Sequence, residues 1–117
     1  MSEYTPDKWV VLKVAGLDQD WWYRILGTWY GGFASGDSWR MNSGITRVEE
    51  KDDHYEVYGT SGSVYICHKG SEGMGAYTAS VLDGFQYNAA QSGGVVEVVD
   101  MKDCQAALWK ASERGLL

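Results

Sequence analysis

Alternation of apolar and polar positions runs through the first 69 residues and predicts β-strands. In residues 8–15 (KWVVLKVA), Val10, Leu12 and Val14 fall on one face, with Trp9 and Val11 on the other, and this period of two is typical of a strand. The same alternation recurs in four later segments: 21–30, 38–48 with a bulge near Ser43 and Gly44, 55–58, and 63–69. Short links between five successive strands favour an antiparallel meander.

The apolar period changes after Gly75 and predicts two helices. Helical spacing relates the apolar residues of 77–89, where Ser80 and Asp83 form a potential capping pair. Residues 95–99 (VVEVV) predict a short strand, and Asp103 is expected to cap a last helix whose apolar face carries Cys104 and Leu108.

The order of these elements, βββββαβα, predicts one α+β domain over residues 1–117. We expect a mainly antiparallel sheet of five to six strands, with both helices covering the face that carries Val10, Leu12 and Val14. The other face would then expose aromatic rings. Val64 and Ile66 are expected to share a face with Tyr55 and Val57 in the hairpin.

Charge and hydropathy narrow the classes of partner. The formal net charge is −6, and residues 49–56 (EEKDDHYE) contribute five acids against one base. We expect no nucleic-acid partner, because phosphate neutralisation needs a basic stripe. We expect no membrane partner either, because no apolar run approaches the roughly 20 residues of a membrane span. The first residues (MSEYTPDKW) do not have the order of a signal peptide, which predicts a cytoplasmic protein.

The stretch from Gly27 to Ile45 is the main candidate for a binding site, because glycines, tryptophans and polar groups are concentrated in it. Its Trp29, Trp39 and Met41 side is expected to build the core. Alternatively, its polar groups satisfy only turn amides. Seven residues are candidates for binding a ligand or partner: Trp22, Tyr30, Asp37, Arg40, Asn42, Ser61 and Ser63. Such groups suit either a protein partner or a planar polar ligand such as a nucleotide.

Catalytic and metal-binding chemistry is weakly indicated. Cys67 and His68 are adjacent and point to opposite faces of a strand, and with His54 and Cys104 they do not have the spacing of a zinc site. The glycine pattern at 31–36 is followed by Asp37, where a phosphate loop needs a lysine. We therefore expect no catalytic residue, cofactor or metal; the alternative is a small hydrolase or transferase that uses Asp37, His68 or Cys67.

One run of the sequence resembles small proteins of tailed phages, notably cyanophages. The run is GDSWRMNSG at 36–44, supported by GSVY at 62–65 and CHK at 67–69, and the resemblance covers roughly residues 9–75. No established activity or catalytic residue accompanies it. The resemblance implies a viral accessory protein in the host cytoplasm that binds, and thereby inhibits, a host component. A host protein is slightly favoured over a nucleotide-like ligand, a virion component is a further alternative, and exposed aromatic rings favour self-association.

Overall fold

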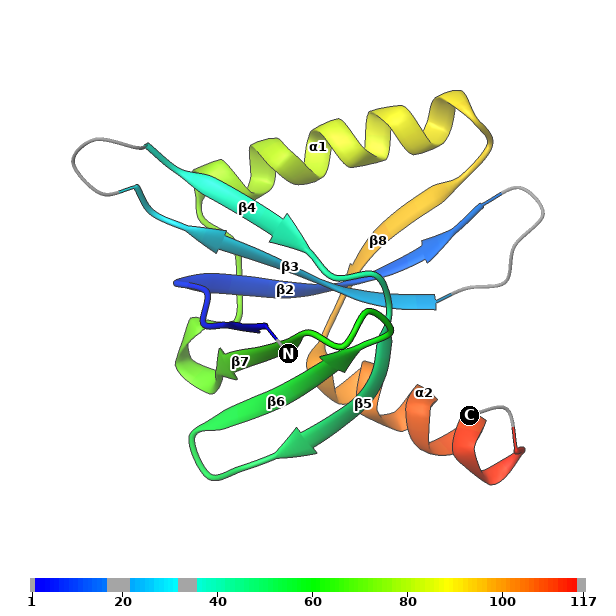
Figure 1. The fold of residues 1–117 in the computed structure, drawn as a ribbon. Helices are drawn as coiled ribbons and strands as arrows, with labels where there is room; N and C mark the ends of the chain where they lie inside the picture. Colours follow the sequence, from blue (N-terminus) through cyan, green and yellow to red (C-terminus); the bar gives the residue numbers. More distant parts are fainter. Residues whose placement is uncertain (1, 17–21, 32–35, 116–117) are drawn as a thin grey trace.

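The structure is a computed structural model that describes residues 2–16, 22–31 and 36–115 (Figure 1). In these residues the chain forms eight strands, two α-helices and one short 3-10 turn. Their bounds are β1 Glu3–Tyr4, β2 Lys8–Ala15, β3 Trp22–Trp29, β4 Ser38–Met41, β5 Ile45–Glu50, β6 His54–Gly59, β7 Val64–His68, η1 Lys69–Ser71, α1 Ala76–Gln91, β8 Val95–Val99 and α2 Met101–Glu113. The α+β class is confirmed.

The strands form two four-stranded sheets, so the expected single sheet of five to six strands is wrong. One sheet has the order β1-β7-β6-β5 and the other the order β4-β3-β2-β8. The division falls inside the segment 38–48, which was expected to be one bulged strand. β4 pairs with β3, whereas β5 pairs with β6. Gly44 lies between them at φ 144°, a conformation that favours glycine and lets the chain pass from one sheet to the other.

Two short strands complete the sheets. β1 runs parallel to β7, pairing Glu3 with Val64, and this strand was not predicted because two residues show no alternation. β8 pairs antiparallel with β2 over residues 95–99, as the run VVEVV indicated. The first expected strand, 8–15, is observed at those bounds.

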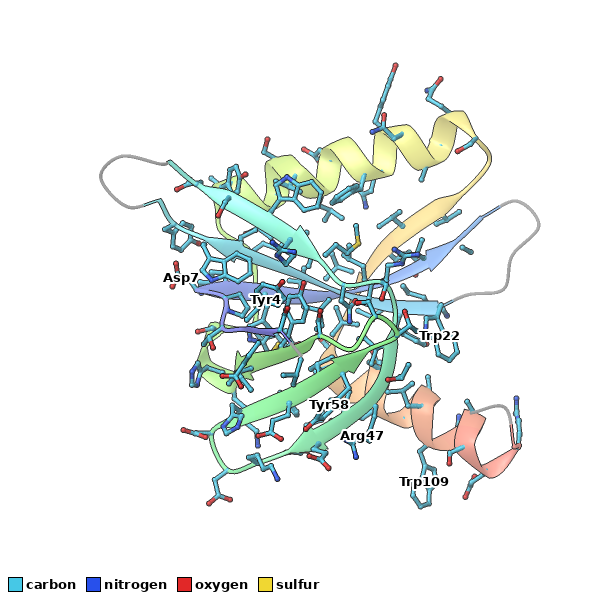
Figure 2. The ribbon with its side chains drawn as sticks, viewed as in Figure 1. Tyr4, Asp7, Trp22, Arg47, Tyr58 and Trp109 are labelled. Carbon is cyan, nitrogen blue, oxygen red and sulfur yellow. The ribbon has the colours of Figure 1, made fainter. Side chains whose placement is uncertain are left out.

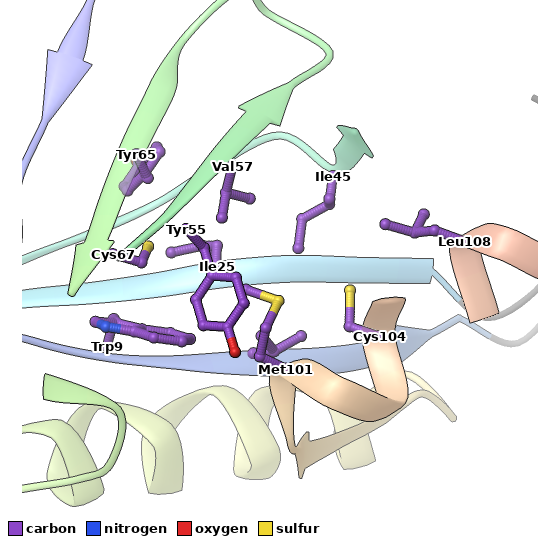
Figure 3. Close-up of a cluster of buried hydrophobic side chains, with 11 residues drawn as sticks. Trp9, Ile25, Ile45, Tyr55, Val57, Tyr65, Cys67, Met101, Cys104 and Leu108 are labelled. Carbon is purple, nitrogen blue, oxygen red and sulfur yellow. The ribbon is translucent and has the colours of Figure 1, made fainter. Parts of the chain in front are cut away.

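The two sheets pack against each other around the main hydrophobic core (Figure 3). This central cluster is the set of buried residues Trp9, Val11, Ile25, Ile45, Tyr55, Val57, Tyr65, Cys67, Met101, Cys104 and Leu108. The sheet face that was expected to expose aromatic rings is therefore covered by the second sheet. The α2 residues Met101, Cys104 and Leu108 also belong to this cluster, so α2 does not lie on the face assigned to it.

The opposite face of the β4-β3-β2-β8 sheet is covered by α1, as predicted for one of the two helices (Figure 1). A smaller cluster of buried residues forms here, namely Val10, Leu12, Leu26 and Leu82. α1 begins at Ala76 with Gly75 as its N-cap, so the potential capping pair Ser80 and Asp83 lies inside the helix. Packing of Val81, Leu82 and Phe85 against the sheet stabilises this helix.

The start of α2 also differs from the expectation. The helix begins at Met101, and Asp103 lies in its first turn instead of capping it. The backbone N–H of Met101 donates to the Glu72 carboxylate, 2.9 Å away. A residue distant in sequence supplies this cap, and a local pattern cannot predict such a contact.

Two expectations about which side chains share a face of a sheet are wrong. Continuous apolar runs do not show which residues of a strand point to the same side. Tyr55 pairs with Cys67 and Val57 with Tyr65, so Val64 and Ile66 lie on the other face of the hairpin. In the other sheet Trp29 pairs with Ser38. Its ring is therefore on the face opposite Trp39, which is 45% exposed.

Candidate functional site

The seven residues proposed from the sequence lie in three separate places. The first is the junction between the two sheets, with Asn42, Ser61, Ser63 and Trp22. The second is the β3–β4 turn, with Tyr30 and Asp37, and the third is Arg40 on β4, beside Tyr4. Figure 2 shows Trp22 well apart from Tyr4, which marks the Arg40 region. The residues therefore do not form one pocket.

Asn42 fastens the crossing chain to β3. The side-chain oxygen of Asn42 accepts a hydrogen bond from the Ile25 backbone N–H at 2.9 Å. The backbone N–H of Asn42 donates to the Ile25 carbonyl at 3.1 Å. The side chain is only 4% exposed, and its Nδ2 has no hydrogen-bond partner among the described residues. Asn42 is thus placed as a structural residue of the junction.

The neighbouring polar groups also bond within the protein. The Ser61 N–H donates to the Ser43 hydroxyl at 3.1 Å, and the Ser63 carbonyl accepts the Gly59 N–H at 2.9 Å. Trp22 packs over Gly44, where an added Cβ would lie 3.1 Å from the indole Cδ1 atom. In these contacts the Ser43 side chain satisfies a turn amide, whereas Ser61 and Ser63 bond through their backbone atoms.

The β3–β4 turn holds Asp37 and Tyr30. An Asp37 carboxylate oxygen accepts the Gly31 N–H at 2.7 Å, and Asp7 accepts the Tyr30 N–H at 2.9 Å. The Tyr30 ring is 45% exposed, and its hydroxyl lies beside Gly75 at the start of α1. Residues 32–35 of the predicted stretch lie outside the described residues.

Arg40 remains available for binding at the other side of this hairpin. Its guanidinium lies 4.4 Å from the centre of the Tyr4 ring, and no carboxylate of the described chain pairs with it. A groove of about 270 Å³ opens here, lined by Tyr4, Trp29, Ser38, Trp39 and Arg40. This groove is the part of the predicted site that is open to a ligand.

The residues of the hydrolase alternative are not brought together. Cys67 is fully buried in the central cluster, whereas the adjacent His68 is exposed on the outer face of its sheet. Burial raises the pKa of the Cys67 thiol, and it raises that of Cys104 to about 12. Both thiols are therefore protonated and unreactive near neutral pH. Among residues 2–16, 22–31 and 36–115, no group of three or more His, Cys, Asp or Glu side chains is arranged to hold a metal ion.

A polar network covers the outer face of the β1-β7-β6-β5 sheet. His54 bonds Asp53 at 2.6 Å and Glu56 at 3.5 Å, and the hydrogen bond to Asp53 is the main cause that raises the His54 pKa. The Tyr58 hydroxyl donates to Glu56 at 3.2 Å, and the Arg47 guanidinium lies 4.1 Å from the Tyr58 ring centre (Figure 2). These contacts order the solvent face of the hairpin.

A larger groove than the one at Arg40 lies between β5 and α2. It has a volume of about 470 Å³ and is lined by Thr46, Arg47, Val48, Gln105, Leu108, Trp109 and Ser112. Leu108 anchors α2 in the central cluster, while the next residue, Trp109, is 67% exposed and projects away from the helix (Figure 2). An indole that exposed is unusual for a residue type that is mostly buried. We call this site the β5–α2 groove.

Within residues 2–16, 22–31 and 36–115, no strand pairs with the outer edge of β5, the strand that forms one wall of the groove. β5 is the last strand in the order β1-β7-β6-β5. The Lys51 N–H donates to the His54 carbonyl, so the antiparallel ladder places Glu49 and Arg47 in hydrogen-bonded pairs with β6. The backbone groups of Val48 and Glu50 therefore point away from β6.

Sequence reasoning missed the β5–α2 groove because it treated the last helix only through its apolar face. Trp109 is adjacent to Leu108 and therefore lies beside that face, at the border with polar positions. A tryptophan at such a border is a signal that the sequence contains. The edge position of β5 has no such signal, because it depends on the sheet order.

No family model, curated protein or solved structure matches this chain in the three comparisons made. Within the part of the chain that the structure describes, neither α1 nor α2 has the length and hydropathy of a membrane span.

Proposed function

We propose that the protein is a non-enzymatic phage accessory protein that binds a host protein stoichiometrically through the β5–α2 groove and inhibits it. The observation that carries the proposal is that an unpaired strand edge and a 67% exposed tryptophan form opposite walls of one groove. Exposed edges are templates for strand addition, and tryptophans are the residues most enriched in binding hot spots.

The partner would contribute an extended segment that adds to β5. In this mode main-chain hydrogen bonds give affinity, and pockets for alternate side chains give specificity. The outward backbone groups of Val48 and Glu50 supply the main-chain bonds, and the indole of Trp109 supplies a surface for an apolar side chain.

Charge supports a basic segment. Residues 49–53 form the end of β5 and the turn that connects it to β6, and four of these five residues are acidic. The acidic residues are therefore concentrated at one end of the edge strand. Complementary charge increases the rate of association more than it increases affinity. Binding should therefore slow as the salt concentration rises, because screening shortens the reach of these charges.

Affinity purification from host lysate tests the proposal with three tagged proteins: the unmodified chain, Trp109→Ala and Tyr87→Ala. Tyr87 is the matched control, because it is an aromatic residue of similar exposure, 68%, on the other helix. The captured protein is then purified and titrated against each variant. Loss of a hot-spot ring weakens binding at least about tenfold, whereas Tyr87→Ala should stay within about twofold.

Amide hydrogen exchange locates the segment on the complex. The Val48 and Glu50 amides should exchange readily in the free protein and become protected in the complex. The Arg47 and Glu49 amides serve as internal controls, since their bonds to β6 protect them in both states. A partner that Trp109→Ala binds as tightly as the unmodified chain, or protection confined to another surface, would contradict the proposal.

The groove at Arg40 favours a second candidate function, sequestration of a nucleotide or another planar anionic ligand. The specific observation is the unpaired guanidinium stacked on Tyr4 beside the half-exposed Trp39. A nucleotide panel should raise the melting temperature of the unmodified protein and not that of Arg40→Ala. Absence of any shift across the panel would remove this candidate.

A further inference from the structure

A third groove lies between α1 and the sheet and shares no lining residue with the β5–α2 groove or the groove at Arg40. It has a volume of about 260 Å³ and is lined by Leu12, Val14, Arg24, Met41, Phe85, Ala89 and Val96. All the sheet residues of this set lie on the α1 face, as the pairings of Leu12 with Arg24 and of Val14 with Val96 show. We call it the α1 groove.

The α1 groove exists because the smaller core is incompletely filled. Leu82 is buried against Val10, Leu12 and Leu26, but further along the helix Phe85 is only partly buried. Ala89, one turn later, has a side chain too short to fill the space over the sheet. The opening is thus lined by apolar side chains that would normally be covered.

Of the described residues that line the α1 groove, Arg24 alone is charged. No carboxylate or other hydrogen-bond acceptor of the described chain pairs with its guanidinium. An arginine beside apolar surface is normally paired with an anion, and it holds a carboxylate through two parallel hydrogen bonds. An apolar chamber with one unpaired cation at its wall is complementary to a molecule that has an alkyl chain and an anionic head.

We propose that the α1 groove binds a medium-chain fatty acid, with its alkyl chain between α1 and the sheet and its carboxylate on Arg24. The groove volume is slightly below the usual 300–1,000 Å³ range of small-molecule sites, which favours a short chain. The few convergent polar groups of such sites fix orientation. Arg24 has that role here, and the surrounding methyl and ring groups provide the apolar contact area.

Calorimetry with three probes separates the two parts of the ligand. Decanoate, used below its critical micelle concentration, carries the chain and the charge, decanol only the chain, and acetate only the charge. Decanoate should bind saturably at a 1:1 ratio. Decanol and acetate should bind at least about tenfold more weakly, because a charge-assisted bond and apolar burial each contribute more than about 1.4 kcal/mol.

Variants test the role assigned to Arg24. Arg24→Gln should lower decanoate affinity to that of decanol and leave decanol binding unchanged, whereas Arg24→Lys should retain most of the decanoate affinity. Arg114→Gln is the matched control: Arg114 is an exposed arginine at the C-cap of α2, on the other helix, and its loss should change affinity less than about twofold.

Intermolecular nuclear Overhauser effects on the unmodified protein provide a test that needs no variant. The decanoate methylenes should contact the methyl groups of Val14, Met41 and Val96. Absence of saturable binding, equal decanoate binding by Arg24→Gln, or contacts confined to Trp109 would each overturn the proposal.

Discussion

The two hydrophobic cores of the molecule differ in how completely they are filled. The central cluster contains eleven buried residues drawn from both sheets and α2, whereas the cluster under α1 contains four. Large rings such as Trp9 and Tyr65 fill the first, and partly buried side chains surround the α1 groove in the second. The central core is therefore the more completely packed of the two, and the core under α1 has a groove beside it.

The difference follows from what covers each face of the β4-β3-β2-β8 sheet. A second sheet presents a broad surface whose alternate side chains interdigitate with those of the first. A single helix presents only a stripe. α1 covers the sheet where Leu82 meets Leu26 and leaves it open near Ala89.

The largest effect is expected for Trp9→Ala in the central cluster. Trp9 is fully buried, packs edge-on against Tyr55 at 5.9 Å between ring centres, and donates its indole N–H to the His68 carbonyl at 2.8 Å. Truncating such a residue costs about 4 kcal/mol, measured as the free energy of unfolding in urea. Trp39→Ala is the control and should cost less than about 1 kcal/mol, because its ring is half-exposed. Similar losses for both variants would contradict the assignment of the larger effect to burial in the central cluster.

Leu82→Ala should destabilise the protein by about 2 kcal/mol, at the low end of the range for buried leucines. Leu82 is buried in the smaller cluster, but the adjoining α1 groove lets neighbouring side chains relax into the space. The same urea titration measures it. A loss as large as that of Trp9→Ala would mean that the α1 core is as tightly packed as the central one.

The Glu72→Ala variant tests how α2 is attached to the central cluster. The Glu72 carboxylate caps the Met101 N–H, and it is also a negative charge at the positive end of the helix dipole. Losing the cap should cost about 1 kcal/mol. Asp103→Ala is the control, because Asp103 is an acidic residue in the first turn of α2 that does not cap the helix. An equal loss of unfolding free energy in both variants would assign the effect to charge alone.

Several elements could be predicted from sequence because their patterns are local. The alternation of Val10, Leu12 and Val14 predicts β2, and the turn at 59–62 predicts the β6–β7 hairpin. The division into two sheets could not be predicted, because it depends on whether β4 and β5 share a partner, and Gly44 permits a bulge or a crossing equally. Of the candidate site, Arg40 and Tyr30 were predicted and are exposed, but Asn42 is buried at the junction.

The smallest expected effect is the dependence of stability on pH. It tests the contact between α2 and Glu50 at the end of β5, beside the central cluster. Glu50 bonds Lys69 at 2.7 Å, and also Lys102 and Gln105 of α2. The hydrogen bond from Lys69 is the main cause that lowers the Glu50 pKa from 4.5 to about 2. Because the folded pKa is lower than the unfolded one, this contribution is complete above pH 4.5 and disappears as the pH falls toward 2.

Unfolding titrations between about pH 6 and 2, with Glu50→Gln as the comparison, isolate this contribution. The unmodified protein should lose more stability than Glu50→Gln over that range, and the difference should shrink in high salt because the side chains are partly exposed. Parallel curves for the two proteins would show that the Glu50 contacts do not help to hold α2 against the central cluster. The central cluster would then need no ionic contact at its border, which would widen its contrast with the α1 groove.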